Sequence, residues 1–167
     1  MTFIYQTSRL SVVEVFSGTL ETETLVSITE LLTTKVVESL PPYFRNINSL
    51  SDAQDWYKKM VSESRLFMVK HTGTNTTIGF VFVFVGNDAD AHIGYLLGES
   101  YWCKGYATEL LKGLIDFIKH ENKIKRLIAG VATNNIVSSK LLHKLGFVKS
   151  ASENDETDFY EYQLSQT

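Results

Sequence analysis

The segment WCKGYAT, residues 102–108, combines residue types that suit the binding of an anion. It follows an apolar run and opens an amphipathic stretch, so we predict a strand end, a short loop and the amino end of a helix. Backbone N–H groups at a helix amino end lack partners within the helix, and the helix dipole adds partial positive charge. Gly105 would let the backbone approach a ligand closely, and Lys104 would add a charge. A diphosphate would fit such a site.

The same segment also suits a plain chain reversal in which Gly105 only tightens the turn, and a lone glycine before a helix does not decide between the two. A second segment, NNIVSSKLLHKLGF at residues 134–147, changes the balance. Asn134 or Asn135 suits the N-cap of another helix, and Ser138 lies in its first turn. Each segment follows a predicted strand, and ligands bind at such an edge where strand order diverges.

A sheet must hold these two segments, and apolar patterning predicts its elements. Ser51, with Gln54 three positions later, fits a capping box for one helix, and Gly146 fits a left-handed cap at the end of another. We expect helices within 20–39, near 52–64, over 105–120 and over 135–145. We expect strands over 9–15, 65–71, 78–85, 91–98, 125–133, 147–151 and 158–164.

The order of these elements predicts the fold class. The strand–helix–strand–helix order from 91 to 145 implies parallel pairing of strands 91–98 and 125–133 with a right-handed crossover, whereas the earlier strands meander. This gives an α/β (α+β) fold with one mixed sheet of about seven strands and helices on both faces. We find no internal repeat or linker, so residues 1–167 are expected to form a single domain.

Composition excludes several classes of function. The chain has 167 residues, is 44% hydrophobic and carries a formal net charge of −3, which suits a packed globule and gives no bulk attraction to nucleic acid. The longest apolar run is far too short to span a membrane. A single cysteine, Cys103, suits a reducing, cytoplasmic location. The chain contains no P-loop, dinucleotide-binding or Ser-hydrolase motif, and its histidines lack metal-site spacing.

The combination of IGYLL, WCKGYATELL and N-x-x-S-x-x-L-x-x-K-L-G-F resembles the GCN5-related N-acetyltransferases (GNAT family). It is most similar to the branch that includes the ribosomal-protein N-terminal acetyltransferases, RimJ and RimL, and TSRLSVVEV resembles the opening strand of that branch. The resemblance covers most of the chain and is strongest over 91–147. The pyrophosphate loop of the family has the pattern [Q/R]-x-x-G-x-[G/A]. Here Trp102 departs from the first position of that pattern but is familiar in the branch, and Cys103 stands where the branch often has Gly.

The resemblance implies acetyl-CoA as acetyl donor, a primary amine as acceptor, no metal, and a mostly antiparallel sheet with a splayed parallel strand pair. It places the pantetheine arm along the edge of strand 93–97 and assigns Ser138 as a proton donor to the departing thiolate. The family's cofactor-binding positions fall, in this sequence, on Tyr95, Leu96, Leu97, Trp102, Cys103, Lys104, Gly105, Tyr106, Ala107, Thr108, Asn135 and Ser138.

The reaction also needs an acceptor for the proton of the amine. His92 has a suitable unperturbed pKa of about 6.5, and Glu99 is the second candidate base. Without an obvious strong base, the site favours an α-amine, which is roughly 10% neutral at pH 7, over a Lys amine at about 0.04%. We therefore expect a protein or peptide N-terminus, such as that of a ribosomal protein, as acceptor.

Other interpretations stay open at this point. The acceptor could be a polyamine or an aminoglycoside, for which the acidic stretch SENDETD at 152–158 would supply charge. The chain could instead be a non-catalytic sensor that binds CoA, or an interaction protein on the same fold with an inactive cleft. The sequence decides neither the acceptor nor whether the chain is a monomer or a homodimer.

Overall fold

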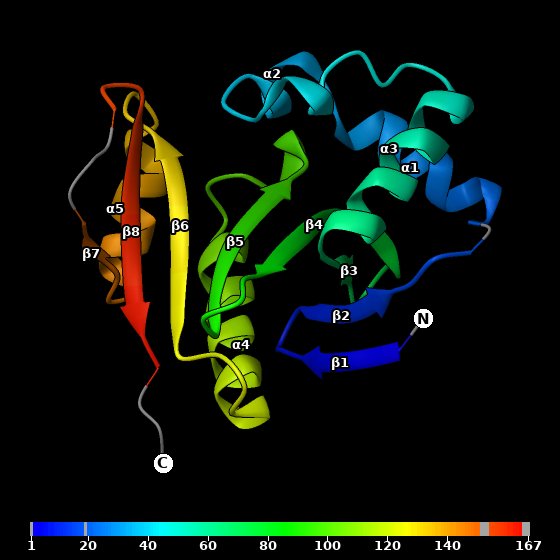
Figure 1. Cartoon of the computed structure of the whole chain (residues 1–167). Helices are drawn as coiled ribbons and strands as arrows, with labels where there is room; N and C mark the ends of the chain where they lie inside the picture. Colours follow the sequence, from blue (N-terminus) through cyan, green and yellow to red (C-terminus); the bar gives the residue numbers. More distant parts are fainter. Residues whose placement is uncertain (1, 19, 151–153, 165–167) are drawn as a thin grey trace.

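The computed structural model describes residues 2–18, 20–150 and 154–164. These residues build one open sheet of eight strands in the order β1-β2-β3-β4-β5-β6-β8-β7 (Figure 1). The strands are β1 (Thr2–Gln6), β2 (Leu10–Val15), β3 (Arg65–His71), β4 (Thr76–Val85), β5 (Asp90–Leu97), β6 (Arg126–Ala132), β7 (Val148–Lys149) and β8 (Thr157–Gln163). Neighbouring strands are antiparallel except β5 and β6, which confirms the predicted mixed, mostly antiparallel sheet.

Helices cover both faces of this sheet. They are α1 (Thr22–Leu31), α2 (Thr34–Val37), α3 (Leu50–Glu63), α4 (Tyr106–Glu121) and α5 (Ile136–Lys144), with short 3₁₀ turns η1 (Pro42–Phe44) and η2 (Glu99–Tyr101). In Figure 1, α1 and α3 lie on one side of the sheet, and α4 and α5 on the other. None of the helices in the described part of the chain is both long and apolar enough to cross a bilayer.

Two details differ from the sequence prediction. Strand β1 was not predicted; it pairs with β2 and raises the strand count from about seven to eight. The capping box of α3 does not use Ser51 and Gln54. The Ser49 hydroxyl accepts from the Asp52 N–H at 3.0 Å, and the Asp52 carboxylate accepts from the Ser49 N–H at 2.9 Å, so the helix begins one residue before Ser51.

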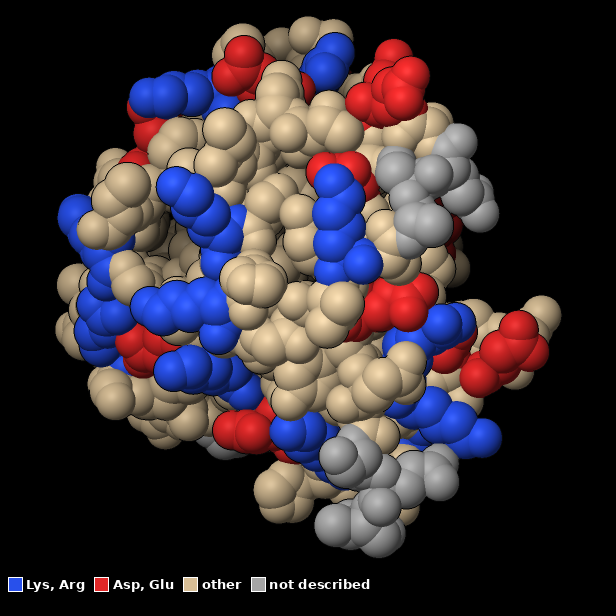
Figure 2. Space-filling model, turned by 90° about the vertical axis from the view of Figure 1, so that its left-hand side faces the viewer, with Lys and Arg blue, Asp and Glu red and all other residues tan. Residues whose placement is uncertain are grey.

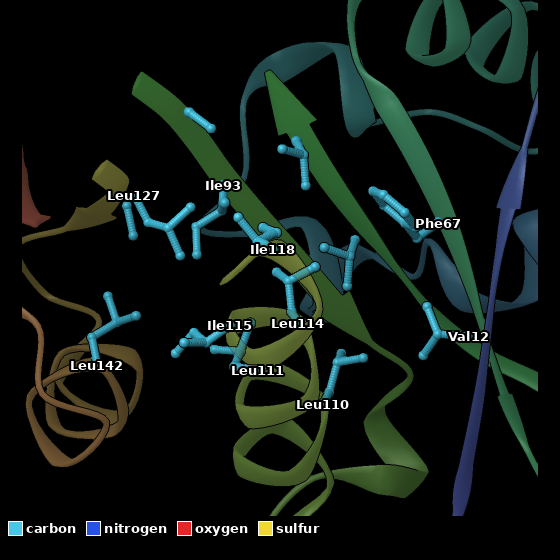
Figure 3. Packing of buried hydrophobic residues seen from close by; sticks show 14 of the residues in the cluster. Val12, Phe67, Ile93, Leu110, Leu111, Leu114, Ile115, Ile118, Leu127 and Leu142 are labelled. Atoms are coloured by element: carbon cyan, nitrogen blue, oxygen red, sulfur yellow. The ribbon is translucent and has the colours of Figure 1, made fainter. Parts of the chain in front are cut away.

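The central strands are buried on both faces because their side chains alternate between two cores. Phe67 and Val69 of β3 point into the core under α4, whereas Leu66 and Met68 point into the core under α1 and α3. Helix α4 presents Leu110, Leu111, Leu114, Ile115 and Ile118 to the first core, as Figure 3 shows. This packing fixes the amino end of α4 at the end of the sheet where β5 stops.

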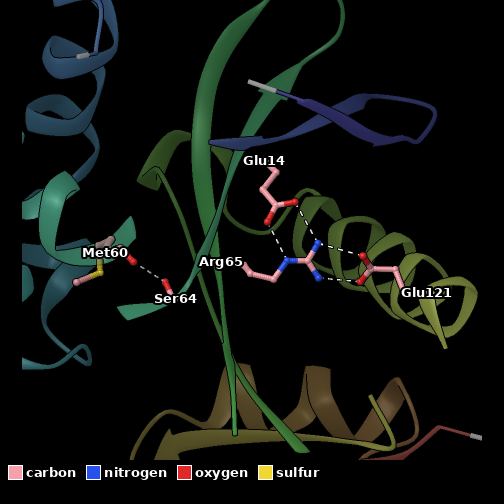
Figure 4. A network of polar contacts seen from close by, with 5 residues as sticks. All are labelled: Glu14, Met60, Ser64, Arg65 and Glu121. Atoms are coloured by element: carbon pink, nitrogen blue, oxygen red, sulfur yellow. Dashed lines mark hydrogen bonds and ion pairs between the residues drawn. The ribbon is translucent and has the colours of Figure 1, made fainter. Parts of the chain in front are cut away.

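A charge network ties β2 and β3 to the far end of α4 (Figure 4). The guanidinium of Arg65 donates to Glu14 at 2.8 and 3.0 Å and to Glu121 at 2.7 and 3.2 Å. Glu14 is buried, and both carboxylates receive paired hydrogen bonds, which is the geometry that arginine forms best. The network therefore holds the helix in register against the sheet.

The parallel strands β5 and β6 separate along their length. Their register runs from Asp90 opposite Arg126 to His92 opposite Ile128, and no further pair is recorded among the described residues. Figure 1 shows the two strands leaning apart toward their carboxyl ends. Arg126 closes the joined end by bridging Asp90 and Glu161. The sheet thus opens at the end that feeds α4 and α5.

Candidate functional site

A cavity of about 470 Å³ lies at this open end of the sheet. It is lined by the end of β5, the loop after η2, the first turns of α4 and α5, and residues of α2 and the segment after it. Since the amino ends of two helices and a strand edge converge on one hollow, the structure places both segments singled out by the sequence in one site. The residues of the two segments that line it are Trp102, Cys103, Gly105, Tyr106, Ala107, Thr108, Asn135, Val137, Ser138 and Leu141.

The first turn of α4 offers free hydrogen-bond donors to this cavity. The first i to i−4 bond of the helix runs from the Glu109 N–H to the Gly105 carbonyl at 3.1 Å. The N–H groups of Tyr106, Ala107 and Thr108 precede it and therefore have no partner within the helix. Among the residues that the structure describes, no side chain caps α4. The three residues all line the cavity, so their donors and the positive end of the helix dipole act together on a bound anion.

The loop before α4 has an unusual backbone. Cys103 and Gly105 both adopt left-handed conformations, with φ of 57° and 80°. Turns of this kind direct successive N–H groups toward one side and form anion-binding concavities. Gly105 suits that conformation because it has no side chain, whereas Cys103 adopts it at a cost of about 1–2 kcal/mol.

Helix α5 begins differently. Asn135 is its N-cap, and its side-chain oxygen accepts from the Ser138 N–H at 3.2 Å. This cap satisfies one N–H group in the first turn of α5, whereas in the described part of the chain the N–H groups in the first turn of α4 have no such partner. The Ser138 side chain is engaged from across the cavity, because the Tyr95 hydroxyl donates to Ser138 Oγ at 3.2 Å. Ser138 is thereby held beside β5.

Burial raises the pKa of the Tyr95 hydroxyl, and the hydrogen bond with Ser138 offsets this only in part. Tyr95 consequently stays protonated at neutral pH, and in this structure its hydroxyl is the donor of the pair. The hydrogen of the Ser138 hydroxyl is then free to point toward another acceptor. A polar hydrogen-bond donor is thus available at the point where β5 and β6 separate.

The backbone groups of β5 point alternately toward β4 and toward the open side of the sheet, and those of Leu96 face β4. The Gly98 N–H donates to Ile78 in β4, and backbone groups alternate along a strand. Those of Tyr95 and Leu97 therefore face the open side of the sheet. The Leu97 carbonyl is already used there, since the Trp102 indole N–H donates to it at 2.8 Å. Trp102 thus anchors the loop to the strand.

Three of the nominated residues lie elsewhere. Lys104 is not among the described residues that line the cavity, and its ammonium donates to the Ser100 carbonyl at 2.6 Å. Glu99 is outside the lining as well and pairs with Lys35 of α2 at 2.8 Å. His92 is exposed at the joined end of β5 and β6, where it pairs with Ile128. The structure does not bring His92 to the cavity.

The structure also adds residues that the sequence did not indicate. Helix α2 and the segment after it contribute Lys35, Val36, Glu38, Ser39 and Leu40 to the lining. The spacing of these residues in the sequence does not indicate a place in the site, because α2 approaches the loop only in the folded structure. Leu141 is different, because it lies three residues after Ser138 and shares its helix face. Within the described residues, no three His, Cys, Asp or Glu side chains gather closely enough to hold a metal ion.

The surface around α5 is rich in positive charge. Lys140 and Lys144 of α5 are exposed. Figure 2 looks onto the side of the molecule where α5 and β8 lie, and Lys and Arg side chains gather over the left half of this view. Such a surface attracts a ligand that carries several phosphates.

Comparison with known proteins gives a consistent picture. A family model described as an acetyltransferase (GNAT) domain matches residues 19–148. The probable N-acetyltransferase YjcK of Bacillus subtilis (strain 168) is 36% identical over 73 residues, which span 44% of this chain and 40% of that relative.

Two solved structures share the fold over nearly the whole chain. RimL, a ribosomal L7/L12 alpha-N-protein acetyltransferase in complex with coenzyme A, aligns with a TM-score of 0.83 at 13% identity, covering 99% of each chain. Spermidine N-acetyltransferase from Vibrio cholerae, in complex with CoA and spermine, aligns with a TM-score of 0.76 at 18% identity, covering 96% of this chain and 98% of that one.

Proposed function

The chain belongs to the GNAT acetyltransferase family, whose model matches residues 19–148, and on that premise we propose that it transfers the acetyl group of acetyl-CoA to a primary amine. One observation carries the proposal: the three free N–H groups of Tyr106, Ala107 and Thr108 open into the same cavity as the Tyr95–Ser138 pair. Acetyl-CoA carries a thioester linked to a diphosphate. The N–H groups suit the diphosphate, and the hydroxyl pair beside them suits the thioester. We propose that residues 1–167 act as one domain and, from the single cysteine, that it is cytoplasmic.

The cavity has the parts that an acetyl-CoA site needs. The N–H groups at the start of α4 and the left-handed loop at Cys103 and Gly105 would hold the diphosphate. The open backbone edge of β5 would align the pantetheine arm. When bound, acetyl-CoA supplies an activated acetyl group on sulfur. We assign Ser138 as the donor of a proton to the sulfur. The Tyr95 hydroxyl donates to Ser138 Oγ, and this leaves the hydrogen of the Ser138 hydroxyl free.

The lining also bears on the acceptor. Among the described lining residues, Glu38 is the single carboxylate and Lys35 the single ammonium, so these two groups give no net negative charge. A polyamine with several positive charges would call for more carboxylates. An α-amine needs little help to lose its proton, since roughly 10% is neutral at pH 7. We therefore propose a peptide or protein N-terminus as acceptor, with Glu99 a closer candidate base than His92 because its partner Lys35 lines the cavity.

The test uses the full chain with acetyl-CoA and four acceptors, and follows release of free thiol. The acceptors are a short peptide with a free N-terminus, the same peptide with a blocked N-terminus and an internal lysine, spermidine, and an aminoglycoside. We expect turnover with the free peptide and at least tenfold less with the blocked one. Turnover with spermidine alone would overturn the acceptor, and CoA binding without thiol release for any amine would identify a sensor instead.

A further inference from the structure

The turn between β1 and β2 lies against the back of the loop that precedes α4. The guanidinium of Arg9 makes three contacts with this region, although about 95–100 residues separate the partners. Nη1 donates to the Lys104 carbonyl at 3.0 Å, and Nε donates to the Glu109 carboxylate at 2.7 Å. The guanidinium carbon lies 4.0 Å from the ring centre of Tyr106. Arg9 is not among the residues that line the cavity, so it approaches the loop from outside.

The contact with the Lys104 carbonyl sets the direction of an amide. The peptide between Lys104 and Gly105 is trans and planar, so its N–H points opposite to its C=O. The C=O points at Arg9, outside the cavity. The Gly105 N–H therefore points away from Arg9, toward the side where the cavity lies. Arg9 thus fixes the direction of the Gly105 N–H through its hydrogen bond to the Lys104 carbonyl.

Glu109 is the second group that Arg9 controls. It lies in the first turn of α4, where a free carboxylate could bind the open N–H groups and would repel an anion. Instead it accepts from the Thr7 hydroxyl at 2.5 Å, from the Arg9 N–H at 2.8 Å and from Arg9 Nε at 2.7 Å. Burial alone would raise the pKa of this carboxyl, but these hydrogen bonds outweigh burial and lower it. The carboxylate is held outside the site, and its charge is compensated.

We propose that Arg9 is a positioning residue for binding of the diphosphate of acetyl-CoA. It acts through two other groups: it orients the Lys104–Gly105 peptide so that the Gly105 N–H joins the donors of α4, and it keeps Glu109 away from them. The inference rests on the proposed function, because it concerns how the same site recognises its donor substrate.

The test compares the wild type with Arg9→Gln and Arg9→Lys, using two acetyl donors. One is acetyl-CoA, and the other is S-acetylpantetheine, which lacks every phosphate. For Arg9→Gln we expect the KM for acetyl-CoA to rise about tenfold or more, while kcat and the KM for the amine change less than twofold. With S-acetylpantetheine the variant should match the wild type in kcat/KM. Arg9→Lys should not restore binding, because an ammonium cannot donate to both partners in the planar geometry of a guanidinium.

Arg126→Gln is the matched control, because Arg126 also bridges two groups by its guanidinium but lies at the joined end of β5 and β6. It should leave the KM for acetyl-CoA unchanged. Equal losses with both donors in Arg9→Gln would show a general structural defect and overturn the proposal. Acetyl-dephospho-CoA lacks the 3′-phosphate. If Arg9→Gln and the wild type had the same KM for this donor, the proposal would also be overturned, since Arg9 would then contact the 3′-phosphate directly.

The outcome separates this inference from the function on which it rests. If the wild type binds CoA and Arg9→Gln binds it equally well, the role of Arg9 is wrong and the proposed function stands. If the wild type does not bind CoA at all, as measured by calorimetry, the proposed function fails and the inference fails with it.

Discussion

The hydroxyl of Tyr95 on β5 donates a hydrogen bond to the hydroxyl of Ser138 on α5, across the point where β5 and β6 separate. At this level β5 is no longer paired with β6, the strand that leads into α5. The contact of Tyr95 with Ser138 therefore spans the opening and presents one hydroxyl hydrogen, that of Ser138, to the cavity. This arrangement makes Tyr95 a support for Ser138.

Removal of the Ser138 hydroxyl should slow the chemical step. We expect Ser138→Ala to lower kcat about 100-fold and to change the KM for acetyl-CoA less than threefold, because a positioned proton donor contributes about 10²–10⁴ in rate. Steady-state kinetics with the peptide acceptor measure both constants. Ser139→Ala is the control, since the Ser139 hydroxyl donates to the Asn135 carbonyl and does not line the cavity. Equal rates for the two variants would remove Ser138 from the reaction.

Loss of the Tyr95 hydroxyl should act through Ser138. In Tyr95→Phe the ring and its packing remain, but Ser138 loses its donor and turns its own hydrogen to another partner. We expect kcat to fall about tenfold, and the double variant Tyr95→Phe/Ser138→Ala to be no slower than Ser138→Ala alone. If the fall in kcat of the double variant equalled the product of the falls in the two single variants, the two hydroxyls would act separately.

Gly105 should be needed for both space and backbone conformation. Its φ is 80°, and a Cβ built there would lie 3.4 Å from Nη2 of Arg9. Gly105→Ala should lower the free energy of unfolding by about 1 kcal/mol and weaken CoA binding, whereas Gly105→Glu should abolish binding by adding bulk and negative charge. Calorimetric titration with CoA checks both. Gly86→Glu, in the turn between β4 and β5, is the control, and unchanged CoA affinity in Gly105→Glu would refute the placement of the diphosphate.

The acid side of the stability profile should depend on Glu109. Its pKa in the folded chain lies below the ordinary value of 4.5. Ionised Glu109 therefore adds stability above about pH 4.5, and this contribution disappears as the pH falls through the lower folded pKa. Glu109→Gln should be less stable than the wild type at pH 7, and the difference should narrow as the pH falls below 4.5. Urea unfolding at several pH values measures it, and a difference that stays constant would contradict the assignment.

The Arg65 network should matter more than an exposed ion pair. Arg65→Met leaves Glu14 and Glu121 facing each other, half-buried or buried, without their shared cation. We expect the free energy of unfolding to fall by about 2–3 kcal/mol, below the range for fully buried pairs because Arg65 retains some exposure. Lys59→Met, which breaks the exposed Lys59–Glu63 pair, is the control and should leave the urea midpoint nearly unchanged.

Local patterns predicted most of the fold. The helical face of Leu110, Leu111, Leu114 and Ile118 and the left-handed Gly146 both stand in the structure as the sequence indicates. Strand β1 escaped prediction because an edge strand of five residues has one partner and a weak pattern. The cap of α3 was misplaced by two residues because two overlapping Ser-x-x-polar patterns compete there, and the carboxylate of Asp52 accepts two N–H groups.

The site was predictable only where neighbours in sequence form it. The loop and the first turn of α4 follow from WCKGYAT, and Asn135 follows from N-cap preference. The contacts of Arg9 with Lys104 and Glu109 join residues about 100 positions apart, and no spacing in the chain encodes them. The lining by α2 is likewise a product of tertiary packing.

The short pairing of β5 with β6 has a consequence for how the molecule holds together. Beyond three rungs, from Asp90 opposite Arg126 to His92 opposite Ile128, the two strands share no ladder in the described residues. A substrate arm seated between them would act as the missing rungs and bind the β6–β8–β7 segment to the larger part of the sheet. Occupancy of the cavity would then appear as slower hydrogen exchange along β6.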